Sequence, residues 1–128
     1  MASEPDTFTA GLNVRRDMFG PEGADKVIEN ATTFTAPLQD FITRYCFGEV
    51  WNRPPLDRKT RSMLTIAILA VLSRPNQLKV HVRGAIANGV TPEEIREVLL
   101  HVMIYGGVPA ASDSFSHAAE VLKDMGLD

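Results

Sequence analysis

Two residues of this chain have the types and positions expected of proton-transfer groups, Glu49 and His81. Glu49 follows Leu38 by 11 residues, so on a continuous helix it would extend an apolar stripe, where a partly dry environment raises the pKa of a carboxyl group. His81 follows Leu78 by three residues and falls on the apolar side of its helix, and imidazole suits proton transfer near neutral pH. Each residue also has a structural interpretation. A helix break at Gly48 would turn Glu49 toward water or an arginine, and a lone histidine on an apolar face is more often a hydrogen-bonded core residue.

A cluster of arginines could hold an anion. Arg53, Arg58 and Arg61 surround a proline loop and the start of the helix that follows it. Guanidinium groups bind carboxylates through paired hydrogen bonds, and cations at a helix start oppose the helix dipole unless an anion joins them. The alternative is an ordinary solvated helix start. Arg83 could be a second anion contact or a surface charge.

Trp51 and Tyr105 could line a pocket around these groups, or they are core or interface aromatics. His101 and His117 each lie near a glutamate at helical spacing, which is typical of a solvated helix face. Neither pairs with another histidine or a cysteine at metal-ligand spacing, so we expect no metal site.

The composition excludes several classes of protein. The chain has 128 residues, of which 45% are hydrophobic and 23% charged, which suits one folded domain and is too apolar for a disordered chain. The net charge of −3 provides no overall positive field to attract nucleic acid or an anionic membrane. One cysteine allows neither an internal disulfide nor a C-x-x-C redox pair.

The longest apolar run, residues 63–72, is too short for a membrane span, which needs about 20 residues. The first seven residues are polar and acidic and contain no secretory signal pattern. We therefore expect a cytoplasmic protein with a flexible N-terminus over residues 1–7 and a single domain over residues 8–128.

Apolar residues recur at helical spacing along the chain, which predicts an all-α fold of about six helices. Breaks are predicted near residues 20–21, 53–55, 73–75, 88–89 and 106–109, where glycine or proline occurs. Thr91, Pro92 and Glu94 have the pattern of a capping box. The helix that carries residues 63–72 is apolar nearly all round and must be covered on all sides. Because a small chain leaves much of that surface uncovered, we expect a homo-oligomer.

Several segments resemble the carboxymuconolactone decarboxylase family. They are GLNVRRDMFG (11–20), GEVWNRPPLDRKTRS (48–62), QLKVHVRGA (77–85), NGVTPEEI (88–95) and YGGVPA (105–110). The resemblance covers about residues 10–122 and implies a fold shared with the alkylhydroperoxidase D proteins, assembled as homotrimers or homohexamers. The peroxidase relatives have C-x-x-C before the histidine that His81 matches, but Arg74 and Gln77 occupy those positions here, which excludes the redox branch. Their upstream glutamate corresponds to Ser62, a second departure.

The resemblance implies the decarboxylation of 4-carboxymuconolactone, a dianionic lactone, to the enol-lactone of 3-oxoadipate during protocatechuate breakdown. No cofactor is expected, because the lactone ring itself accepts the electron pair. Under this hypothesis His81 is the general acid and Glu49 orients it or shares its proton. The substrate-binding residues would be Arg53, Arg61, Arg83, Trp51 and Tyr105. The alternatives are a decarboxylase or isomerase that acts on another lactone or keto acid, and a non-catalytic helical oligomer that binds anions.

Overall fold

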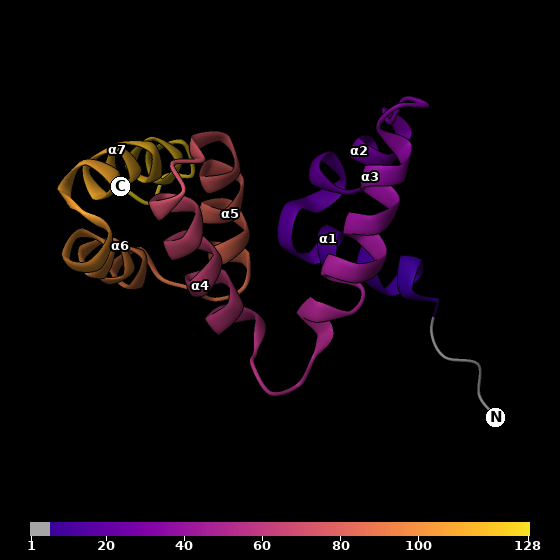
Figure 1. The fold of residues 1–128 in the computed structure, drawn as a ribbon, viewed down its shortest axis with the longest axis horizontal. Coiled ribbons are helices and arrows are strands. Elements are labelled where there is room, and N and C mark those ends of the chain that lie inside the picture. The colour runs from indigo at the N-terminus through magenta and orange to yellow at the C-terminus, as the bar shows by residue number, and fades with distance from the viewer. Residues whose placement is uncertain (1–5) are drawn as a thin grey trace. The chain divides into compact units, whose positions relative to one another are not determined.

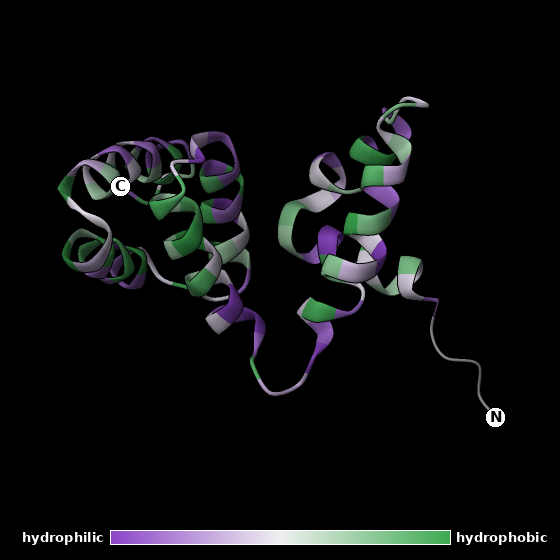
Figure 2. Cartoon of the chain, in the orientation of Figure 1, coloured by the Kyte–Doolittle hydropathy of each residue, from purple (hydrophilic) through white to green (hydrophobic). Residues whose placement is uncertain are grey.

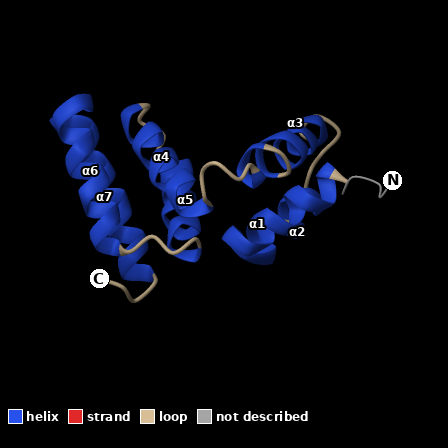
Figure 3. Cartoon of the chain, turned by 90° about the horizontal axis from the view of Figure 1, so that it is seen from below, coloured by secondary structure: helices blue, strands red, loops and turns tan. Residues whose placement is uncertain are grey.

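A computed structural model describes residues 6–128, and every regular element in that range is helical (Figures 1 and 3). The predicted all-α fold is confirmed. The elements are α1 (Thr7–Gly23), α2 (Asp25–Glu29), α3 (Ala36–Phe41), the π-helical turn η1 (Ile42–Phe47), the 3-10 turn η2 (Val50–Asn52), α4 (Arg58–Val71), α5 (Pro75–Ala87), α6 (Pro92–Gly106) and α7 (Val108–Asp124). The chain divides into a first compact unit that ends at Arg58 and a second unit, Lys59–Asp128. The single domain expected from the sequence stays a prediction.

The start of the chain differs from the expectation. Of the residues 1–7 that were expected to be flexible, residues 1–5 lie outside the described part of the chain. Asp6 and Thr7 instead form the beginning of α1, because the Asp6 carboxylate accepts a hydrogen bond of 3.2 Å from the Phe8 amide. This is an N-cap, which satisfies one of the amide donors that a helix start leaves open.

Glycine and capping residues set several of the predicted helix boundaries. Gly20 has a φ of 70° and kinks α1, and Gly107 has a φ of 104° between α6 and α7. Both are left-handed conformations that side chains disfavour. The capping box at the start of α6 is confirmed: Thr91 Oγ1 accepts from the Glu94 amide at 3.1 Å, and the Glu94 carboxylate accepts from the Thr91 amide at 3.0 Å.

The first unit is built on the contact between α1 and η1. Its buried cluster consists of Val14, Met18, Phe47 and Trp51. The two backbones approach so closely at Gly11 that a Cβ atom there would overlap the carbonyl oxygen of Thr43. Glycine at this position therefore permits the packing of the first unit.

A buried arginine joins the same elements. Arg15 donates hydrogen bonds to Gln39 Oε1 at 3.0 Å, to Thr43 Oγ1 at 3.1 Å and to the Gly23 carbonyl at 3.3 Å. Its guanidinium carbon also lies 5.6 Å from the centroid of the Phe47 ring. Burial lowers the pKa of Arg15, and these neutral partners compensate for the water that the guanidinium has lost.

Most of the apolar stripe that begins at Leu38 does not face the core of the first unit, although Ile42 packs against the buried cluster. Leu38, Phe41 and Tyr45 are 57%, 59% and 51% exposed, whereas Thr43 and Phe47 are buried. Leu38 and Phe41 lie on α3, whereas Tyr45 lies in the π-helical turn, in which the Gly48 amide bonds to the Thr43 carbonyl at 2.9 Å, five residues back. Such a turn changes the register that 3.6-residue spacing assumes.

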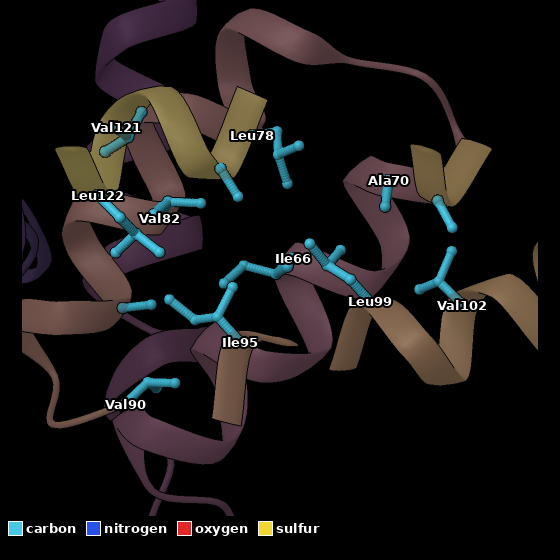
Figure 4. Close-up of a cluster of buried hydrophobic side chains, with 13 residues drawn as sticks. Ile66, Ala70, Leu78, Val82, Val90, Ile95, Leu99, Val102, Val121 and Leu122 are labelled. Atoms are coloured by element: carbon cyan, nitrogen blue, oxygen red, sulfur yellow. The ribbon is translucent and has the colours of Figure 1, made fainter. Parts of the chain in front are cut away.

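The second unit has the larger core, drawn in Figure 4. Helix α7 packs on both α5 and α6, and α4 contributes its buried residues to the shared cluster. Ile66 of α4 lies among Val82 of α5 and Ile95 and Leu99 of α6. The core therefore buries one side of α5, the helix that carries His81.

One face of α4 stays exposed in the described chain. Leu64, Ile68, Val71 and Leu72 line this face at helical spacing and are all exposed. Figure 2 shows this helix as one of the strongly hydrophobic segments of the chain. The homo-oligomer that was expected to cover this helix stays a prediction. Within residues 6–128, no helix has the length and apolar character to span a bilayer.

We predict that Gly11→Ala destabilises the chain by about 1–3 kcal/mol, because the added methyl group must displace the Thr43 carbonyl. The change in unfolding free energy can be measured by urea titration. Asn13→Ala in the same helix is the control: Asn13 is exposed, so its substitution should change stability by less than about 0.5 kcal/mol. Equal stability of Gly11→Ala and Asn13→Ala would contradict the close packing of α1 on η1.

Candidate functional site

His81 is the predicted site residue with the most perturbed environment. It lies on α5, and most of its imidazole, including Nδ1, is buried. Burial lowers the pKa of His81 from 6.5 to about 4, since an imidazolium loses hydration when it leaves water. His81 is therefore neutral near pH 7. The residue predicted to be the general acid therefore lacks, in the free protein, the proton that it would donate in the reaction.

A side-chain hydrogen bond joins the ends of α4 and α5, the two helices that one short turn connects. Asn88, directly after α5, donates from Nδ2 to Ser62 Oγ of α4 at 3.0 Å. Ser62 is 0% exposed and Asn88 is partly buried. The sequence identified Asn88 only as a helix stop and Ser62 only as a departure from the peroxidase relatives. Their contact could not be read from spacing, because it joins positions 26 residues apart.

Glu49 is exposed, so the partly dry environment predicted for its carboxyl group is wrong for the described chain. The cause is the end of the π-helical turn at Gly48, after which Glu49 is the N-cap of η2 and no longer continues the helix. This outcome matches the alternative in which Gly48 breaks the helix. Glu49 belongs to the first unit and His81 to the second, and the predicted role of Glu49 in orienting His81 or sharing its proton stays a prediction.

Trp51 is a core aromatic of the first unit. It is buried, and its ring centroid lies 5.8 Å from that of Phe47. Arg53 follows on the exposed loop after η2. Arg58 of the predicted cluster already has carboxylate and amide partners, with Asp17 at 3.0 Å and Asn52 at 3.3 Å. The cluster is therefore partly neutralised within the first unit.

The remaining predicted residues lie in the second unit. Arg61 is partly buried on α4, directly before Ser62. Arg83 is exposed on α5 and lies 3.8 Å from Asp124, a long ion pair of the surface kind that contributes little. Of the two cations, Arg61 lies closer in sequence to the polar contact between α4 and α5.

Tyr105 lies on an apolar groove between α4 and α6 with a volume of about 640 Å³. Its side chain is 82% exposed, and its ring centroid lies 5.0 Å from that of His101. The groove is lined by Thr60, Met63, Leu64, Ala67, Val71, Glu97, Val98, His101, Val102, Tyr105 and Gly106. His81 is not among them, so the groove does not bring the predicted aromatic wall to the predicted acid.

The site residues present no metal centre. Among residues 6–128, no three side chains of His, Cys, Asp or Glu gather closely enough to hold an ion. Among the groups of the second unit described above are the imidazole of His81, the hydroxyl–amide pair of Ser62 and Asn88, and the guanidinium groups of Arg61 and Arg83. These can move a proton and bind carboxylates.

Comparison with known proteins gives a consistent result. Residues 36–120 match the model of the Carboxymuconolactone decarboxylase family. The chain is 40% identical over 125 residues to the 4-carboxymuconolactone decarboxylase of Acinetobacter baylyi. The aligned residues cover 98% of this chain and 93% of the relative. It is 42% identical over 118 residues to the nitrosuccinic acid decarboxylase of Metarhizium robertsii, covering 92% of this chain and 82% of the relative. An uncharacterized 15.0 kDa protein of Paracoccus denitrificans is 41% identical over 78 residues, 59% of this chain and 58% of the relative.

Acid should destabilise the fold partly through His81. Between pH 6.5 and 4 the unfolded chain binds a proton at His81 that the folded chain does not, so stability falls as the pH drops through this range. We expect roughly 2 to 3 kcal/mol of such loss, complete below pH 4. Urea titrations of wild type and His81→Gln at pH 7 and pH 4 measure it, and the variant should lose less stability on acidification.

The control for this comparison is Val82→Ala, which removes a buried apolar group from the same helix. It should lower stability by about the same amount at both pH values, because no titratable group changes. If His81→Gln and wild type lose equal stability between pH 7 and pH 4, the burial of a neutral imidazole is not the cause.

Proposed function

Because the chain belongs to the carboxymuconolactone decarboxylase family, we propose that it is a decarboxylase and that its substrate is 4-carboxymuconolactone. The observation that carries the proposal is the 40% identity to a 4-carboxymuconolactone decarboxylase over 98% of the chain. All the predicted site residues fall within residues 36–120, which match the family. The environment of His81 supports a role in proton transfer.

The proposed reaction needs no electron acceptor besides the substrate. The bond between the departing carboxylate and the ring carbon beside the lactone oxygen breaks, and carbon dioxide leaves. The electron pair moves through the ring alkene onto the lactone carbonyl, and a proton then adds to carbon to give the enol-lactone. The protein must hold two carboxylates, stabilise the charge that develops on the carbonyl oxygen, and deliver that proton.

His81 would receive its proton together with the substrate. In the free protein its pKa of about 4 keeps the imidazole neutral at pH 7. A dianion bound beside it would favour the imidazolium and raise that pKa. His81 would then donate the proton to carbon after carbon dioxide has left. This refines the general acid of the sequence hypothesis, since the acid forms only in the complex.

The other site assignments rest on charge and position. We assign the carboxylates of the substrate to Arg61, with Arg53 and Arg83 as further candidates. Arg61 is favoured because it is partly buried and lies beside the contact between α4 and α5. Glu49 would orient the imidazole or share its proton. Trp51 and Tyr105 stay candidates for the pocket wall.

A homotrimer or homohexamer is part of the proposal. It is supported by the exposed apolar face of α4 and by the groove on which Tyr105 lies, because such surfaces mark interaction sites. Light scattering coupled to size exclusion measures the assembly state. The cytoplasmic location expected from the sequence stays a prediction.

A second candidate substrate is nitrosuccinic acid, favoured by the 42% identity to a nitrosuccinic acid decarboxylase. The two acids have a common core: each is a succinate whose second carbon bears the departing carboxylate and an electron-accepting group. That group is the unsaturated lactone in one acid and the nitro group in the other. Both retain the second carboxylate on a neighbouring methylene carbon. One arrangement of an arginine and a proton donor could serve either acid.

We predict that the purified protein releases carbon dioxide from 4-carboxymuconolactone faster than from nitrosuccinic acid. His81→Gln should lower kcat by about 10²- to 10⁴-fold, the usual contribution of a general acid. His117→Gln on α7 is the matched control and should retain wild-type turnover. Faster release from nitrosuccinic acid would favour the second candidate, and release from neither acid would reject both.

The pH dependence tests how His81 obtains its proton. Because kcat/KM reports the free protein, it should fall about tenfold per pH unit above pH 4 if the protonated imidazole is required. The kcat should stay constant up to a higher pH, because it reports the substrate complex, in which the pKa of His81 is raised. A kcat/KM that is flat from pH 5 to pH 7 would contradict proton uptake with the substrate.

A further inference from the structure

Helices α4 and α5 are tied together at one end by the chain itself. The connecting turn spans residues 72–74, where the Ser73 amide bonds to the Ala70 carbonyl at 3.2 Å and the Arg74 amide bonds to the Leu69 carbonyl at 3.0 Å. Ser73 has a φ of 56°, a conformation that a side chain seldom adopts, so this turn has a defined geometry. The turn fixes the beginning of α5 against the end of α4.

A side-chain hydrogen bond ties the other ends of the same helices. Asn88 is the C-cap of α5, and its backbone amide bonds to the carbonyls of Gly84 at 3.0 Å and Ala85 at 3.1 Å. Its side chain donates to Ser62 Oγ at 3.0 Å. Ser62 has no exposed surface, so without Asn88 water could not easily replace the lost partner. The contact between these ends of α4 and α5 therefore depends on the Asn88 amide and the Ser62 hydroxyl.

His81 lies on α5 between these two ties. Asn88 follows it by seven residues, close to two helical turns, so the two side chains project from the same side of α5. Gly84 and Ala85, the intervening residues on that side, are both buried. A rotation or shift of the end of α5 would therefore change the position of the imidazole as well.

We propose that Asn88 is a positioning residue for His81, acting through its hydrogen bond to Ser62. The bond fixes the rotation of α5 against α4 and with it the direction of the imidazole. This inference rests on the proposed role of His81 in decarboxylation. It assigns to Asn88 and Ser62 no contact with the substrate.

The kinetic test is a double-mutant cycle. Asn88→Ala should lower kcat about tenfold, because a misdirected acid impairs the chemical step. Ser62→Ala should have a similar effect, and the double variant should be no worse than the more impaired single variant. Effects that multiply, or a change confined to KM, would overturn the proposal.

Thr65→Val is the matched control. It removes a hydroxyl of α4 that donates to the Arg61 carbonyl at 2.8 Å within the same helix, so it breaks a comparable bond without untying the two helices. It should retain kcat. A loss of kcat equal to that of Asn88→Ala would show that any lost hydrogen bond in α4 has this effect.

A readout that does not depend on activity separates this inference from the proposed function. The ring proton signals of His81 in the NMR spectrum should shift in Asn88→Ala and in Ser62→Ala but stay as in wild type in Thr65→Val. Shifted signals in a protein that decarboxylates neither acid would support the positioning and reject the proposed function. Unchanged His81 signals in both variants would overturn the positioning role.

Discussion

The removal of one imidazole from water is the constraint on which the site depends. The core of the second unit buries one side of α5, and burial there lowers the pKa of His81 to about 4, so the imidazole is neutral near pH 7. This burial costs stability in acid. In the proposed reaction, His81 is neutral in the free protein and gains its charge only in the substrate complex. The same core that makes the fold stable therefore sets the condition for proton transfer.

Helix boundaries and the all-α fold could be predicted because they depend on local chemistry. Gly20 and the capping box at Thr91 act through backbone conformation and neighbouring amides, and both are visible in the sequence. The π-helical turn could not be predicted in this way. It accompanies the close approach of α1 at Gly11, which depends on residues more than 30 positions apart. The missed turn ends at Gly48 and explains why Glu49 no longer continues the helix.

The candidate site also combines features that could be predicted from the sequence with features that could not. The spacing around His81 predicted its position on the apolar side of α5, and the structure confirms a largely buried imidazole. Spacing did not predict that burial would lower its pKa, because that depends on how closely other helices pack around it. The contact between Asn88 and Ser62 was missed for a related reason. Polar pairs between helices leave no periodic signal in a sequence.

The buried Arg15 of the first unit has a consequence for how the molecule responds to acid. Its partners are an amide, a hydroxyl and a backbone carbonyl, none of which gains or loses a proton in the acid range. The joint between α1 and η1 is therefore held by a charge that neither mild acid nor modest salt removes. In the second unit, by contrast, acid acts on an imidazole close to the core. The two buried polar groups therefore differ in what acid does to them: Arg15 keeps its charge and its contacts, whereas His81 gains a charge inside its unit.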